Sequence, residues 1–385
     1  MRAAYTHLTF MIFLASVTLY VSGEQAVNAQ QITFPFRWQD GFHTVPPFTH
    51  QDTLDICIIG DVMMHSGQIS DACRGTESHD FTPWFEHIRE KVASADISIA
   101  NMEFPLAGEP YEGYPTFSAP ESIARCMADC GFDVLLAANN HIYDKGSRGA
   151  MRTAETYRQL EESHGVTFTG IAENDSARAL NNPLILHKKN ISVAFINCTY
   201  GTNLGADMHW PKVNYLNDKV TMTHALKRAE EEADITIVLP HWGIEYRLAH
   251  SQTQEETARW LSDNGADVII GSHPHTVQDA GLVNGRTAVA YSLGNAVSNM
   301  SAPDTQIGLL ADVRIIRDTD GSCRIDPIGF TYLWCSRPGG FCDTYKILPV
   351  KEFLGTRDRW RGKWEYDKMV STYRRVMAAT GIDDK

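Results

Sequence analysis

The chain has 385 residues, of which 43% are apolar, and its formal net charge is −13. This length and apolar content suffice for a large hydrophobic core in one or two domains. The acidic balance leaves no basic stripe of the kind that a nucleic-acid backbone requires, so nucleic acid is excluded as an expected partner.

Residues 1–29 have the pattern of a secretory signal peptide. Arg2 supplies a positive start, residues 8–21 are almost wholly apolar, and small residues follow up to Gly23 and Ala29. We therefore expect cleavage after Gly23 or Ala29 and an exported protein, either periplasmic or at the cell surface. The apolar run is short for a transmembrane helix, but left uncleaved it would anchor the chain to a membrane. An extended arm rich in Pro and aromatic residues is expected over 30–50.

From residue 51 onward, short apolar runs alternate with amphipathic stretches. Strands are expected at 54–61, 95–103, 132–141, 190–198, 234–242, 266–275 and 287–295, and helices at 82–94, 120–131, 147–165, 220–233 and 251–265. This alternation predicts an α/β fold with largely parallel sheets over residues 51–305. Residues 306–385 are expected to complete the same domain, with two strands joined by a hairpin at Asp318–Gly321 and a final helix over 370–381.

Polar side chains follow strand after strand in this pattern. Because the carboxyl ends of strands in an open α/β sheet face one crevice, residues far apart in sequence can meet there. Carboxylate, amide and imidazole donors suit Mn, Zn or Fe rather than a structural thiolate site. Each residue alone also has a structural explanation, such as helix capping for Asp61 or a hydrogen-bonded core histidine for His241. The candidate ligands are Asp61, Glu103, Asn140, His241, His273 and His275.

Other chemistries lack their motifs. The sequence contains no G-x-S-x-G, no P-loop and no G-x-G-x-x-G after a strand, which argues against a serine hydrolase and a nucleotide-binding loop. It also contains no C-x-x-C. Of the eight cysteines, Cys335 and Cys342 bracket a short loop and either pair as a disulfide or stay free.

Six segments together resemble the bacterial capsule synthesis protein CapA family, also called PGA_cap. They are "GDVMMH", "NMEFPL", "AANNHIYDKGSRGAMRT", "PHWGIEY", "GADVIIGSHPHTVQ" and "YSLGN", and they cover about 245 residues. The family is related to the calcineurin-like metallophosphoesterases. The resemblance therefore implies a four-layer α/β/β/α sandwich with two divalent metal ions between strand-end loops.

The resemblance also implies roles for individual residues. Glu103 falls where the phosphoesterases place a bridging aspartate, and His141 falls beside the leaving group, where it would act as a general acid. His273 and His275 would each bind a different ion. His65 lies near a further ligand position, and Glu245 either orients His241 or a substrate amine or is merely solvated. The implied metal ligands are Asp61, Glu103, Asn140, His241, His273, His275 and His65, and the implied catalytic residues are His141 and Glu245.

These features predict an exported, metal-dependent hydrolase in capsule or poly-γ-glutamate-type polymer biosynthesis or processing. Its substrate would be an anionic polymer or a small molecule, and capsule synthase components would be its protein partners. The alternatives are a non-catalytic component of polymer export or assembly, and a metallophosphodiesterase. Glutamate in place of the bridging aspartate argues against the last of these.

Overall fold

The computed structural model describes residues 51–75, 78–205 and 210–385. The signal peptide and the extended arm expected over 1–50 lie outside these described residues. A nine-stranded sheet is built around β1 (Asp52–Val62), which runs parallel to β2 and antiparallel to β14. Its other strands are β2 (Ile97–Met102), β3 (Val134–Leu136), β4 (Thr167–Thr169), β13 (Asn295–Val297), β14 (Ile307–Arg317), β15 (Cys323–Ile325), β16 (Gly329–Ser336) and β17 (Lys346–Pro349).

A second, six-stranded sheet has the order β11-β12-β10-β9-β7-β6. Its members are β6 (Leu184–Lys188), β7 (Ile191–Thr199), β9 (Ile235–His241), β10 (Val268–Ile270), β11 (Ala280–Val283) and β12 (Thr287–Ala290). The central strands β7, β9, β10 and β12 are parallel, as expected for strands joined through helices. Two short strands, β5 (Ile171–Ala172) and β8 (Lys212–Val213), pair with each other.

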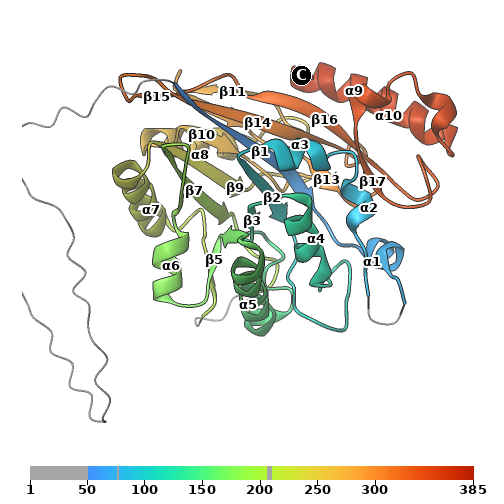
Figure 1. The fold of residues 1–385 in the computed structure, drawn as a ribbon, viewed down its shortest axis with the longest axis horizontal. Helices are drawn as coiled ribbons and strands as arrows, with labels where there is room; N and C mark the ends of the chain where they lie inside the picture. The colour runs from blue at the N-terminus through green and yellow to red at the C-terminus, as the bar shows by residue number, and fades with distance from the viewer. Residues whose placement is uncertain (1–50, 76–77, 206–209) are drawn as a thin grey trace, which may run out of the picture. The chain divides into compact units, whose positions relative to one another are not determined.

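The two sheets pack face to face and helices cover their outer faces (Figure 1). Alternate residues of each strand show this directly. In β1, Ile58 joins a core shared with Phe195 of the second sheet, whereas Ile59 faces the helices on the other side. In β7, Ile196 faces the outer helices of the second sheet. The structure therefore confirms the four-layer α/β/β/α sandwich.

The helices occupy three places. The first sheet is covered by α2 (Thr82–Phe85), α3 (Arg89–Ser94), α4 (Ser122–Cys130) and α5 (Gly146–His164), and the second sheet by α7 (Lys219–Glu232) and α8 (Gln252–Asp263). The C-terminal helix α10 (Lys363–Thr380) packs through Met369 and Val376 into the core between the sheets. Shorter elements are α1 (Ser66–Ala72), α6 (Asp175–Asn181), α9 (Val350–Phe353) and the 3₁₀ turn Arg357–Arg359.

The segment 82–94 differs from the single helix that the sequence predicts. It is split into α2 and α3 by a tight turn in which Ile88 N donates to Phe85 O, three residues back rather than four, and both side chains are buried. The strands predicted over 132–141 and 266–275 are also shorter, because their polar ends leave the sheet and form loops.

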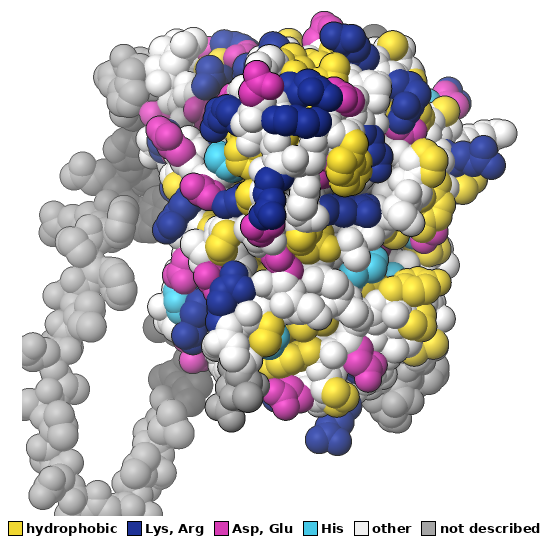
Figure 2. Space-filling view, turned by 90° about the vertical axis from the view of Figure 1, so that its right-hand side faces the viewer, with side chains coloured by type: hydrophobic (Ala, Val, Ile, Leu, Met, Phe, Trp, Pro, Cys, Tyr) yellow, Lys and Arg dark blue, Asp and Glu magenta, His cyan; other side chains and the backbone are white. Residues whose placement is uncertain are grey.

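Three further features concern the surface and the cysteines. All eight cysteines lie in the described part of the chain and are free, Cys335 and Cys342 among them. Among the described residues, no helix has both the length and the apolar character to cross a bilayer. In Figure 2, Lys and Arg side chains gather on the upper part of the face shown, the part where Figure 1 places α9 and α10.

Candidate metal centre

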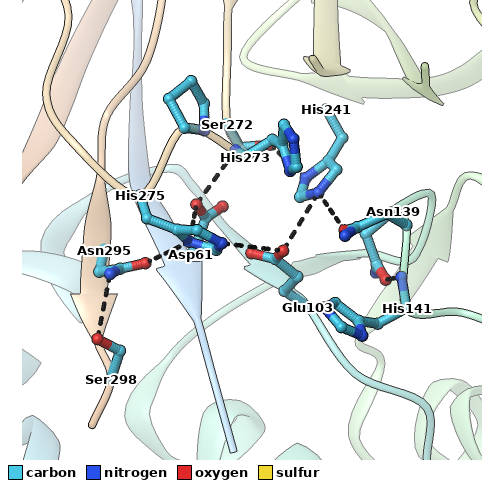
Figure 3. A network of polar contacts seen from close by, with 12 residues as sticks. Asp61, Glu103, Asn139, His141, His241, Ser272, His273, His275, Asn295 and Ser298 are labelled. Atoms are coloured by element: carbon cyan, nitrogen blue, oxygen red, sulfur yellow. Dashed lines mark hydrogen bonds and ion pairs between the residues drawn. The ribbon is translucent and has the colours of Figure 1, made fainter. Parts of the chain in front are cut away.

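Five candidate ligands come together at the carboxyl ends of β1, β2, β9 and β10 (Figure 3). Asp61 is the next-to-last residue of β1, Glu103 directly follows β2, and His241 is the last residue of β9. His273 and His275 follow β10. All five side chains are buried, with 0–3% of their surface exposed. The convergence expected from parallel strand ends is therefore the arrangement that the structure shows.

A glycine contact sets the end of β1 against β13. Asp61 N donates to Gly294 O at 2.9 Å, and a Cβ atom added to Gly60 would lie 1.9 Å from that same oxygen. Only glycine at position 60 therefore lets the two backbones approach this closely. The approach brings Asn295 of β13 beside the centre, where its Oδ1 lies 3.0 Å from His275 Nδ1.

The segment His273-Pro274-His275 has an unusual backbone. Both histidines have positive φ, 97° and 59° respectively, a region that costs non-glycine residues free energy and is found at functional sites. The carboxylate of Asp61 holds the segment, since its Oδ2 accepts from His273 N at 3.1 Å. Both imidazoles face the centre as a result, with ring centroids 5.9 Å apart.

Glu103 occupies the middle of the cluster. Its Oε1 lies 3.3 Å from His241 Nε2 and 3.7 Å from His275 Nε2. The side chain is fully buried, yet neither carboxylate oxygen has a hydrogen-bond partner among the described residues. A buried carboxylate without donors is costly unless a cation compensates for it. His273 Nδ1 is likewise buried without a partner.

The electrostatics of the cluster follow from burial and from these pairs. Burial opposes ionisation of Asp61, but His275, His241 and Asn101 together outweigh it and hold the pKa of the carboxyl below its usual range. Burial disfavours the charged form of His275, but Glu103 and Asp61 raise its pKa to about 9. Burial and the neighbouring histidines lower the pKa of His273 well below its usual value, so that imidazole is neutral and able to act as a ligand.

The carboxylate oxygens and imidazole nitrogens of these residues are atoms that bind divalent metal ions. Two groups of three have ligand atoms within 4.8 Å of one another, and both contain Glu103. One group is Glu103, His273 and His275, and the other is Asp61, Glu103 and His241. The resemblance assigns His273 and His275 to different ions, whereas this grouping puts both histidines in the same set of ligand atoms.

Asn140 and His65 have different surroundings. Asn140 Oδ1 lies 2.8 Å from His241 Nε2, so its amide oxygen faces the cluster. His65 belongs to neither group of candidate ligands. It caps α1, with its Nδ1 3.0 Å from Gln68 Oε1, and burial lowers its pKa to about 4. It also lines the cavity that includes His275, and its role as a metal ligand stays a prediction.

His141 lies next to the cluster and is oriented by a buried carboxylate. Its Nδ1 is 2.7 Å from Oδ2 of Asp144, and that oxygen also accepts from Phe117 N at 2.8 Å. Asn203 reaches both Asn140 and His141, at 3.3 Å in each case. Asn203 is not predicted from the sequence, because the loop that carries it shows no periodicity; its only signal is that it follows the end of β7.

Glu245 is exposed and lies on the loop after β9. It lines a cavity of about 620 Å³ over the centre, together with His65, His141 and His275. Among the described residues it contributes no ligand atom to either candidate group. Of the five buried candidate ligands, the described lining of the cavity includes His275.

The chain matches known proteins along most of its length. The family model described as "Bacterial capsule synthesis protein PGA_cap" matches residues 55–300. A capsule biosynthesis protein CapA from Bacillus anthracis is 28% identical over 76% of this chain and 71% of that protein. A PGA biosynthesis protein CapA from Bacillus subtilis is 25% identical over 77% of each.

Two solved structures are similar at low identity. A phosphatase from Mycoplasma pneumoniae is 12% identical, covers 74% of this chain and 95% of its own, and has a TM-score of 0.45. An NAD nucleotidase from Haemophilus influenzae is 14% identical, covers 85% of this chain and 67% of its own, and has a TM-score of 0.44. With identities of 12% and 14% and TM-scores below 0.5, these two likenesses carry no argument about activity.

Proposed function

Because the chain belongs to the bacterial capsule synthesis protein family PGA_cap, we propose that it is an exported, metal-dependent hydrolase that acts on a poly-γ-glutamate-type capsule polymer during its biosynthesis or processing. The observation that carries the proposal is Glu103. Its two buried oxygens lack hydrogen-bond donors and lie between two sets of candidate ligands. A carboxylate shared by both sets would be a ligand for divalent ions, with Mn, Zn and Fe all suited to the donor set.

Different residues would bind the ions, donate a proton and position the proton donor during hydrolysis. Bound divalent ions would supply Lewis acidity and a water of lowered pKa. Asp61, Glu103, Asn140, His241, His273 and His275 would hold the ions. As the imidazolium, His141 would donate its Nε2 proton to the leaving amine, while its Nδ1–H donates to Asp144, which fixes the ring orientation. Asp144 is thus a positioning residue rather than a catalytic one.

Metal analysis and substrate assays test the hydrolase directly. The mature protein should contain a stoichiometric divalent metal by elemental analysis, and after reloading with Mn²⁺ or Zn²⁺ it should cleave γ-glutamyl amides faster than phosphodiesters. Faster cleavage of phosphodiesters would support the metallophosphodiesterase alternative. If the metal-loaded protein cleaves neither substrate, the result would support the alternative of a non-catalytic component of polymer export or assembly. A protein that takes up no metal would refute the metal centre itself.

Export forms a separate part of the proposal. It is supported by the pattern of residues 1–29, with a positive start, an apolar run and small residues. N-terminal sequencing of the secreted or periplasmic form should begin at Glu24 or Gln30. An intact N-terminus in the membrane fraction would instead indicate an anchored protein beside capsule synthase components.

A further inference from the structure

The cavity over the metal centre has an unusual charge for a site that would bind an anion. Among the described residues that line it there is no Lys or Arg, whereas Asp144 and Glu245 both contribute carboxylates. Arg337 is near enough to His65 to help lower the pKa of that imidazole, but it is not part of the lining. Sites that recognise phosphate or carboxylate groups usually present Arg or Lys. The described lining residues themselves therefore offer an anion no cationic side chain.

Partly exposed tyrosine rings lie near Glu245. The ring of Tyr200 packs on His273 at 4.7 Å between centroids, and the ring of Tyr246 packs on His275 at 6.1 Å. Both tyrosines nevertheless remain 43% and 46% exposed, and Tyr114, on the same cavity, is 73% exposed. The rings of Tyr200 and Tyr246 thus each pack against a candidate ligand and stay partly exposed; Tyr246 lines the cavity, and Tyr200 lies outside its lining.

The backbone places Tyr246 at a conformational cost. Its φ is +63°, and its N–H donates to Pro274 O at 2.8 Å, which ties the loop after β9 to the His273-Pro274-His275 segment. Strain of this kind in a non-glycine residue persists where surrounding structure imposes it, and it clusters at ligand sites. Burial and then the charge of Glu245 raise the pKa of Tyr246 to about 12, and the same two causes raise that of Tyr200. Glu245 and Tyr246 also line the same cavity, and the charge of Glu245 reaches Tyr200.

We propose that Glu245, with the rings of Tyr200 and Tyr246, binds a primary ammonium group of the substrate, so that the protein acts at the amino-terminal end of a γ-linked glutamate chain. A carboxylate beside open aromatic faces is a favourable environment for a cation. Within such a polymer only the terminal residue carries an ammonium group, whereas internal residues offer carboxylates that Glu245 repels. The inference rests on the proposed function for its choice of polymer, but ammonium binding can be measured without turnover.

A thermodynamic cycle tests the inference. The probes are γ-glutamyl-glutamate with a free amine and its N-acetyl derivative, and their binding to the Mn²⁺-loaded protein is measured by calorimetry. We expect the wild type to bind the free amine about three- to fivefold more tightly, the range of a partly exposed ion pair. Glu245→Gln should abolish that preference, while Glu231→Gln, an exposed glutamate on α7, should retain it.

The outcomes separate this inference from the proposed hydrolase. A wild type that binds both probes equally, or a preference that survives in Glu245→Gln, overturns ammonium recognition. If the preference depends on Glu245 but neither probe is cleaved, ammonium recognition stands and the hydrolase proposal fails. If both probes are cleaved with equal kcat/KM and equal affinity, the hydrolase stands and cleavage at the amino end is refuted.

Discussion

Replacing Glu103 by Gln should remove metal binding while leaving the fold intact. The amide keeps the size of the side chain but loses the negative charge that both sets of candidate ligands share. In the metal-free protein two effects oppose each other. The substitution removes a buried charge that has no hydrogen-bond donors, and it also removes the attraction to His241 and His275. The metal-free melting temperature should therefore change little.

The size of the effect follows from linkage. A ligand that binds only the folded state stabilises it by about 2.7 kcal/mol when its concentration is 100 times Kd. For domains of 150–250 residues, 1 kcal/mol raises Tm by roughly 2–4 °C, and the shift per kcal/mol falls with size. With 385 residues in this chain, Mn²⁺ or Zn²⁺ at that concentration should raise the Tm of the wild type by roughly 5 °C. Glu103→Gln should show no shift at the same concentration.

The assay is thermal unfolding of chelator-treated protein with and without added metal, followed by elemental analysis. Glu365→Gln is a matched control, because Glu365 is also fully buried but accepts from Trp334 Nε1 and Arg337 N, away from the centre. Its starting Tm can differ, but the metal-induced shift should remain that of the wild type. A shift of wild-type size in Glu103→Gln, with bound metal at the same stoichiometry, would refute the central position given to this carboxylate.

Three other substitutions or reagents give further checks. Asp144→Asn should lower kcat by about 10- to 100-fold, because His141 loses its orienting partner, while calorimetry should find metal affinity unchanged; an equal loss of both would point to a structural role. Gly60→Ala should destabilise the protein by at least about 1–3 kcal/mol in urea unfolding, since the new Cβ meets Gly294 O at 1.9 Å, and a neutral result would contradict the close approach. Cys73 should react first with a thiol reagent, because it is the one exposed cysteine of the eight, all of which lie among the described residues; rapid release of several thiols from the native protein would disagree.

Much of the centre could be predicted because strand ends obey a general rule. The periodicity of residues 54–61 and 234–242 identifies buried strands, and Asp61 and His241 each lie at the carboxyl end of a strand in its own sheet. The same reasoning located His273 and His275. Their partners on intervening loops followed no comparable rule, so Asn203 received no role although it contacts Asn140 and His141.

For His65 the structure adds a second role to the one expected from the sequence. Its place after Asp61 in "GDVMMH" made it a candidate ligand, but the chain turns into α1 at that point and the imidazole caps the helix through Gln68. Sequence patterns place helix ends only to within a few residues.

The sequence by itself determined the α/β class, most of the longer strands and helices, and the donor types that gather at the strand ends, because these depend on local periodicity and on the direction of parallel strands. Only the tertiary structure decided that Glu103 lies between two sets of ligands without a donor, and that Tyr200 and Tyr246 pack on the histidines beside Glu245. Those distances are set by how two sheets pack across a shared core and by how close glycines let neighbouring backbones approach, and neither quantity is encoded in any single segment.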